Sequence, residues 1–454
     1  MKKERSAIFL FCLQLLPFFV VFLFGLALLI KTQGAPVGDY GNYYYGSRFL
    51  TEGTNPLLFY QNIHTFNEMV KAAGENNFFL NYTPVPPFSL LFYKIFLVDD
   101  VSYSKLIFGL FCLLIFCLAL HTLHREFKVP AHTIYFVPVV FLLPMYSGFL
   151  QGQSYLFVTA LMIWFFVAVE RQKPLLAGLC AATVFSLKVF PAFILLYPLM
   201  KRDWKTPGWT LLFLLLLHLP LIISGNLDLL IYYYKVIFPR LAMNDVTAPF
   251  AAHDQGIASF LLKLFVKDNL LNPFPFFESV VLAAVCMLVF QTLTAIGILQ
   301  VLRSKVRSQS IGIMLLGLAL LSRYLPVYSL VFLVPVLLLS FNFLQKPKYV
   351  LFVVLLTVAI NLPAQWLQNL PLVFRYPRLM ILSGLFLWLI FELRPGFSWL
   401  VFGLILLFAL PAAIGVFRYG EQLPAIRPAR GSIYDFSLTG DTVVLMVCKG
   451  SVDT

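Results

Sequence analysis

Long apolar runs separated by short polar segments make up most of the chain. The first run, residues 8–30, is nearly unbroken and long enough for a helix to cross a bilayer. Comparable runs recur, and the shorter ones suit tilted or broken helices. These later runs are 101–123, 134–146, 155–169, 175–187, 192–200, 209–223, 279–302, 311–321, 327–341, 350–362, 379–390 and 399–417. The pattern predicts an all-α polytopic membrane protein with about 11–13 transmembrane helices.

Short clusters of lysine and arginine between the runs indicate how the helices are oriented. With a cytoplasmic N-terminus, all the clusters fall on the cytoplasmic side, as the positive-inside rule requires. The clusters are Lys2, Lys3 and Arg5; Arg125 and Lys128; Arg171 and Lys173; Lys201, Arg202 and Lys205; Arg303, Lys305 and Arg307; and Lys346 and Lys348. This orientation requires segment 86–98, which contains Lys94, to lie on the outer surface as an interfacial helix.

The same orientation places the longest polar segments outside the membrane. We expect one transmembrane module over residues 1–417, with a first outer loop at 31–100 that carries amphipathic interfacial helices and a long outer loop at 224–278. Residues 418–454 form a short outer tail, and their alternating, turn-containing sequence predicts a small hairpin. This tail is too short for a core of its own.

Composition supports a membrane protein and excludes several other classes. The 454 residues are 60% hydrophobic and only 12% charged, with a mean hydropathy of +0.87, far above that of soluble proteins. The net charge of +13 comes from clusters between apolar runs, which is typical of membrane topology and not of a nucleic-acid-binding face. The sequence shows neither metal-ligand spacing nor a glycine-rich nucleotide loop, so we expect no metal and no cofactor.

One acidic residue, Asp39, lies just past the first apolar run, in a polar and aromatic segment rich in turn residues. A carboxylate at the mouth of a membrane helix can take a proton from a hydroxyl group at the bilayer surface. A lipid-linked substrate presents its head group at that depth. The alternative is that Asp39 only caps a short helix that begins near Tyr40, since Asp is favoured at that position.

A series of polar features follows Asp39 along the chain. They are GTNP at 53–56, YTPVPP at 82–87, GQ at 152–153, KVFP at 188–191 and SRYLPVY at 322–328. In this order, on a membrane scaffold, the features resemble the integral-membrane glycosyltransferases of the GT-C class. Within that class they most resemble glycosyltransferase family 87, the polyprenyl-phosphate-mannose-dependent mannosyltransferases. The resemblance covers roughly residues 1–345, although the late element lacks the Trp and His of the family pattern.

The resemblance implies the GT-C glycosyltransferase fold and a reaction at the outer leaflet. A sugar would move from a polyprenyl phosphate to an acceptor, with inversion at the anomeric carbon. In-line displacement needs a base for the acceptor hydroxyl, and the resemblance implies Asp39 in that role. The leaving phosphate needs cations nearby. The residues that we predict to bind substrate are Arg48, Tyr82, Gln153, Lys188, Asp254, Gln255 and Arg323.

Several of these predictions have a plainer alternative. Lys188 and Arg323 lie at the ends of predicted helices, where long basic side chains commonly reach to lipid phosphate. Gln153 can bind sugar hydroxyls, or it can simply belong to a turn between two helices. Asp254 and Gln255 can bind acceptor hydroxyls, or Asp254 can be an ordinary solvated loop carboxylate. The tyrosine run 43–45 can stack on a sugar or belong to an interfacial aromatic belt.

The sequence therefore predicts a membrane glycosyltransferase that moves a hexose, mannose by the resemblance. Its predicted partners are a polyprenyl-phosphate-linked sugar donor, a glycan or glycolipid acceptor and membrane lipids, but no nucleic acid. The expected location is the inner membrane of a bacterium, with the active site facing outside. Two alternatives stay open: a lipid-linked sugar flippase or transporter, which would usually show internal repeats and midplane charges, and a glycan polymerase or ligase.

Overall fold

The computed structural model describes residues 2–75, 85–188, 190–239, 250, 254–268, 272–303, 307–322, 324–342, 344–367, 370–393, 435–439 and 442–446. Helices dominate this part of the chain. Within it, 4 helices are long and apolar enough to cross a membrane, and a bent pair of shorter helices brings the number to 5 if it is one span. The protein is an all-α polytopic membrane protein, as the apolar runs predict. The predicted span at 399–417 lies outside the described residues.

The elements follow the apolar runs and the polar segments between them. The long helices are α1 (Lys2–Lys31), α6 (Val101–Phe127), α12 (Lys205–Ile223) and α16 (Val280–Leu302). The polar segment between α1 and α6 holds α2 (Tyr40–Thr51), α3 (Leu57–Gln61), α4 (Ile63–Ala72) and α5 (Phe88–Lys94). Segment 86–98 therefore contains a short helix.

The remaining helices are shorter. In the first half of the chain they are η1 (Ala131–Tyr135), α7 (Phe136–Val140), α8 (Leu142–Gln151), α9 (Tyr155–Glu170), α10 (Pro174–Leu187), η2 (Phe190–Leu195), α11 (Leu196–Met200), α13 (Leu227–Tyr232) and η3 (Tyr233–Ile237). In the second half they are α15 (Ile257–Phe265), α17 (Arg307–Leu321), η4 (Val327–Leu333), α18 (Val334–Ser340), α19 (Lys346–Asn361), η5 (Ala364–Leu367), η6 (Leu372–Arg375) and α20 (Pro377–Leu393).

The tail contains a pair of strands, β1 (Asp435–Thr439) and β2 (Thr442–Met446). They pair antiparallel, with Thr439 opposite Thr442. A hairpin is what the alternating sequence of this segment favours.

The predicted span at 134–146 is broken rather than straight. The η1–α7 segment and α8 meet at an angle of 61°. Pro144 has no N–H for the carbonyl of Val140, so the helical hydrogen bond is missing there. Asn361 of α19 replaces it, since its Nδ2 donates to Val140 O at 2.7 Å and its Oδ1 accepts from Leu143 N at 2.9 Å. A neighbouring side chain thus satisfies the backbone at the break, as an apolar surrounding requires.

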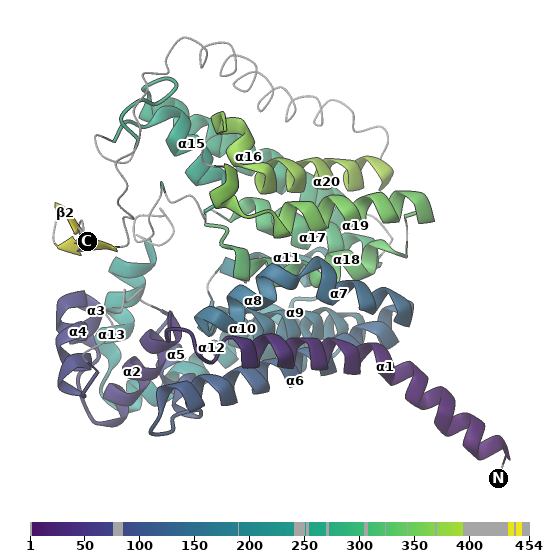
Figure 1. The fold of residues 1–454 in the computed structure, drawn as a ribbon, viewed down its shortest axis with the longest axis horizontal. Helices are drawn as coiled ribbons and strands as arrows, with labels where there is room; N and C mark the ends of the chain where they lie inside the picture. Colours follow the sequence, from purple (N-terminus) through teal and green to yellow (C-terminus); the bar gives the residue numbers. More distant parts are fainter. Residues whose placement is uncertain are drawn as a thin grey trace, which may run out of the picture.

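The helices pack in layers (Figure 1). Helix α9 is buried over almost its whole length and packs against α6 and α10, and α10 packs against α12. Helices α1 and α6 approach closely because each places a glycine against a leucine of the other. A Cβ added at Gly25 would lie 2.5 Å from Leu113 Cδ1, and a Cβ added at Gly109 would lie 2.6 Å from Leu29 Cδ1. Helices α16 to α20 form a second group on the side of α7–α11 that faces away from α1 (Figure 1). Helices α2–α5 lie together beyond the C-terminal end of α1 (Figure 1).

Charged residues pair at the bundle end away from α2–α5. Arg171 binds Glu126 at 2.6 Å, joining the C-terminal ends of α6 and α9. Lys201 binds Glu170 at the same end. Three of the predicted cytoplasmic clusters, those following α6, α9 and α11, therefore lie at one end, and the N-terminal ends of α6 and α9 face the other.

Candidate active site

Asp39 lies in the turn between α1 and α2. It occupies the N-cap position of α2, but its side chain makes no capping hydrogen bond. Its Oδ2 instead accepts from Gln153 Nε2 at 2.6 Å, and its backbone N–H donates to Gln151 Oε1 at 3.3 Å. The capping interpretation therefore does not describe what this carboxylate contacts.

Gln153 follows the C-terminus of α8, in the turn that leads into α9. Gly152 ends α8 with φ +64°, a left-handed conformation that glycine adopts readily. The side chain of Gln153 is nearly fully buried, and its Oε1 accepts from Tyr43 OH at 3.0 Å and from Lys188 Nζ at 3.1 Å. The amide thus bridges the carboxylate on one side and the ammonium on the other. Gln153 does belong to a turn, and it also joins three charged or polar groups.

Lys188 is the first residue after α10 and is half-buried. Besides Gln153, its Nζ binds Tyr43 OH at 3.1 Å. The ammonium lies over two aromatic rings, 5.5 Å from the centroid of Tyr43 and 5.2 Å from that of Tyr155. The side chain is therefore directed at the Asp39 cluster.

Burial and neighbouring charges shift the pKa values of Asp39, Lys188 and Tyr43. Burial raises the pKa of Asp39, and the Gln153 hydrogen bond and the charge of Lys188 only partly offset this effect. Burial lowers the pKa of Lys188 to about 8, although the charge of Asp39 opposes the change. The pKa of Tyr43 is well above its usual value, chiefly through burial, so the phenol stays protonated and donates. A carboxylate with a raised pKa is a stronger base than an ordinary one.

Aromatic rings enclose this cluster. Tyr43 stacks on Tyr93, with the ring centroids 4.3 Å apart. Tyr155 packs against Tyr328 of η4, with the ring centroids 5.6 Å apart. Tyr93, Tyr155 and Tyr328 were not predicted as site residues because tyrosines near helix ends resemble an interfacial belt. Tyr155 directly follows the QGQS turn at 151–154, and Tyr328 ends the 322–328 feature, so their positions in the sequence were a usable signal.

The tyrosine run 43–45 does not act as a unit. Only Tyr43 reaches Gln153 and Lys188. Tyr44 donates instead to the carbonyl of Val98, at 2.7 Å, beyond the end of α5.

A second polar cluster forms around Asp254. This residue is 0% exposed, so it is not a solvated loop carboxylate. Its Oδ1 accepts from Gly256 N at 2.9 Å and from Leu325 N at 3.1 Å. Arg378 is also buried, and its Nη1 donates to Leu325 O at 3.5 Å. Gln255 Nε2 donates to a backbone carbonyl at 2.8 Å, that of Arg375, so the cluster joins three segments of the chain.

The other predicted site residues lie elsewhere. Arg48 is at the far end of α2 and forms an ion pair with Glu52 at 2.8 Å, apart from the Asp39 cluster. Tyr82 and Arg323 lie outside the described residues. The structure thus brings Asp39, Gln153 and Lys188 together and leaves Arg48 aside.

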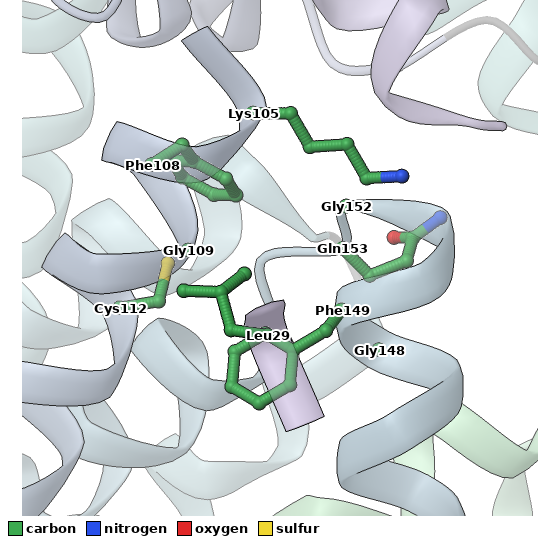
Figure 2. Close-up of a pocket in the computed structure, with 9 residues that line it drawn as sticks. All are labelled: Leu29, Lys105, Phe108, Gly109, Cys112, Gly148, Phe149, Gly152 and Gln153. Carbon is green, nitrogen blue, oxygen red and sulfur yellow. The ribbon is translucent and has the colours of Figure 1, made fainter. Parts of the chain in front are cut away.

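A small cavity lies beside the Asp39 cluster (Figure 2). Its volume of about 10 Å³ has room for roughly one water molecule, so it is not a sugar site. Its polar lining comes from Lys105 and Gln153, and Figure 2 shows the Lys105 side chain extending from α6 towards the turn at Gly152. Among the described residues, no group of three or more His, Cys, Asp or Glu side chains is arranged to hold a metal ion.

These features define an integral-membrane protein with a carboxylate, an amide and an ammonium group joined at one end of its helices. The family model of glycosyltransferase family 87 matches residues 82–322, more than half of the chain, and the protein belongs to this family. It is therefore a membrane glycosyltransferase. Neither a curated protein nor a solved structure matches the chain.

Proposed function

We propose that the protein transfers a hexose, most simply mannose, from a polyprenyl phosphate to a glycan or glycolipid, with Asp39 as the general base. The observation that carries the proposal is the hydrogen-bonded chain from Asp39 through Gln153 to Lys188. It puts a base and a cation within one cluster, which is what displacement of a phosphate by a hydroxyl group requires. Asp39 and Lys188 each keep a small exposed surface.

The reaction follows from this arrangement. The oxygen of the acceptor hydroxyl forms a bond to the anomeric carbon, and the bond from that carbon to the phosphate oxygen breaks. The hydroxyl proton goes to the carboxylate of Asp39, and polyprenyl phosphate leaves with the electron pair. Lys188 stabilises the charge on that phosphate. The tyrosines around the cluster exclude water from it.

The proposal places the site on the outer face of a bacterial inner membrane. The ion pairs of Arg171 and Lys201 mark the opposite end of the bundle, and clusters of basic residues are retained in the cytoplasm. The Asp39 end then faces outside, where a polyprenyl-linked sugar is presented after it has been moved across the membrane. We assign the catalytic module to residues 1–417 and the outer tail to 418–454.

The test is transfer of radiolabelled mannose from synthetic polyprenyl-phosphate-mannose in membranes that contain the wild-type protein, Asp39→Asn or Asp228→Asn. Asp228 is an exposed carboxylate in the first turn of α13 and serves as the matched control. We expect transfer by the wild type and the control and a loss of about 10²- to 10⁴-fold in Asp39→Asn at equal expression. Equal transfer by all three would remove Asp39 as the base. No transfer by the wild type, with movement of the donor lipid across the bilayer, would favour a flippase.

A further inference from the structure

Lys105 is a buried cation that the proposed reaction does not use directly. It lies in the second turn of α6 and is only 3% exposed. An ionisable side chain inside a membrane helix is costly, so its surroundings must compensate for the lost water. Its Nζ donates to the carbonyl of Leu150 at 2.7 Å and to that of Pro36 at 3.4 Å.

The carbonyl of Leu150 is available because of the way α8 ends. The last carbonyls of a helix have no donor within the helix. Here the N–H groups of Gly152 and Gln153 fold back onto Phe149 and Gly148, at 3.2 and 2.9 Å. Leu150 O is left for Lys105, whose charge also complements the negative end of the helix dipole.

The carbonyl of Pro36 belongs to the segment that carries Asp39. One ammonium group therefore ties the Asp39 turn to the end of α8. Two further hydrogen bonds join Asp39 to the same end of α8. The backbone N–H of Asp39 donates to Gln151 Oε1, and Gln153 Nε2 donates to the Asp39 carboxylate. Without Lys105, the Leu150 and Pro36 carbonyls would lose the donor that they share.

Lys105 also adds to the charges that act on Asp39. Two lysines act on this carboxylate, and their positive charges lower its pKa against the larger effect of burial. The tyrosines near it are neutral phenols and add no charge. The titratable groups around Asp39 are Lys105 of α6, Lys188 after α10, Tyr43 of α2, Tyr155 of α9, Tyr324 before η4 and Tyr328 in η4.

We propose that Lys105 is a positioning residue for sugar transfer: it fixes Asp39 against the end of α8 and supplies it with a buried positive charge besides that of Lys188. This inference rests on the proposed role of Asp39 as the base. Lys105 does not touch substrate. It acts through the Leu150 and Pro36 carbonyls and through the charge it presents to the carboxylate.

The first test compares Lys105→Met, Lys105→Arg and the control Lys71→Met in the full-length protein. Lys71 is an exposed residue of α4 that forms an ion pair with its neighbour Glu68. In Lys105→Met we expect kcat to fall about 10- to 100-fold, with the KM for the donor changed less than about 2-fold. The acid limb of the kcat profile should move up by roughly half a pH unit to one unit, because the base loses a neighbouring cation. Lys105→Arg should restore most of kcat and the original acid limb.

The second test needs no substrate. A hydrophobic carbodiimide reacts with protonated buried carboxyl groups, so its labelling of Asp39, read by mass spectrometry across a pH series, reports the protonation of this residue. We expect the labelling midpoint to move to higher pH in Lys105→Met and to stay in place in Lys105→Arg and Lys71→Met. If Lys105→Met does not fold, Lys105→Gln, which keeps a donor but no charge, gives the same measurement.

The outcomes separate the two proposals. An unchanged labelling midpoint and an unchanged acid limb in folded Lys105→Met would overturn the role of Lys105, whatever the substrate is. A wild type that transfers no hexose from any polyprenyl phosphate, or an Asp39→Asn variant with wild-type transfer, would overturn the proposed function, and the labelling would still decide whether Lys105 acts on Asp39.

Discussion

The side-chain amide of Gln153 donates to Asp39 Oδ2 at 2.6 Å, although the two residues are 114 positions apart in the sequence. The other end of the same amide accepts from Lys188. An amide cannot titrate, so it connects the carboxylate and the ammonium group without exchanging protons with them. This arrangement places the Gln153 amide between Asp39 and Lys188 in place of a direct ion pair.

Gln153→Leu should reduce transfer strongly while the protein still inserts and folds. The substitution removes a hydrogen bond to a charged group, which is worth about 1.5–3 kcal/mol, so we expect kcat to fall roughly 10- to 150-fold. Gln61→Leu, at an exposed position at the end of α3, is the matched control. Wild-type kcat in Gln153→Leu would show that the amide does not support the base.

The rate of transfer should depend on pH at both ends of the neutral range. Asp39 must be ionised to accept a proton, and burial raises its pKa, so the rate should fall with acid at a higher pH than for an ordinary carboxyl group. Lys188 must be charged to stabilise phosphate, and because its pKa is lowered to about 8, the rate should also fall as the pH rises through that value.

Lys188→Arg tests the assignment of the alkaline limb. A guanidinium group stays charged throughout this range, so the part of the fall above about pH 8 that comes from Lys188 should disappear, whatever the change in the maximal rate. Any alkaline fall that remains should come from loss of the Lys105 charge, and it should disappear in the double variant Lys188→Arg with Lys105→Arg. The measurement is kcat between about pH 5 and pH 10 for the wild type and the variant. An alkaline limb that stays at the same pH in Lys188→Arg would assign it to another group.

Asp254→Ala should destabilise the protein rather than alter the chemistry at Asp39. The carboxylate is fully buried, binds the backbone of Gly256 and Leu325, and acts on the buried guanidinium of Arg378. Removal of one partner from a buried charged cluster costs about 3–5 kcal/mol. We expect a clear loss of thermal stability in detergent, a smaller loss in Asp254→Asn, which keeps an acceptor, and little change in the exposed control Asp228→Ala. A stable but inactive Asp254→Ala would instead point to contact with substrate.

The sequence predicted the helices well because apolar runs and their breaks are local signals. The break at Pro144 shows the limit: the proline is visible in the sequence, but its compensation by Asn361 depends on a contact between residues 218 positions apart. Similarly, the order of Asp39, Gln153 and Lys188 indicated an outer-face site, whereas the hydrogen bonds among them depend on how four elements meet.

Lys105 and Arg48 show two further limits of the analysis from sequence. Lys105 sits at the start of an apolar run, where lysines usually reach to the membrane surface, so its burial was not predictable from spacing. Arg48 was predicted to bind substrate from its expected side of the membrane, yet Glu52 stands four residues later on the same helix face. That spacing was visible in the sequence and predicts the ion pair that the structure contains.

Gly152→Ala should reduce transfer through geometry alone, since it changes neither charge nor hydrogen-bonding groups. Gly152 has φ +64°, and a Cβ there would lie 2.5 Å from the Cβ of Tyr40, the residue next to Asp39. The left-handed conformation costs an alanine about 1 kcal/mol, and relief of the clash must move Tyr40 or the turn that carries Gln153. We expect a fall in kcat of about 10-fold or more together with lower thermal stability. Gly384→Ala in α20, where a Cβ would meet nothing within 4 Å, is the control and should keep wild-type activity. Equal activity in the two variants would mean that the Gly152 turn does not set the position of Asp39.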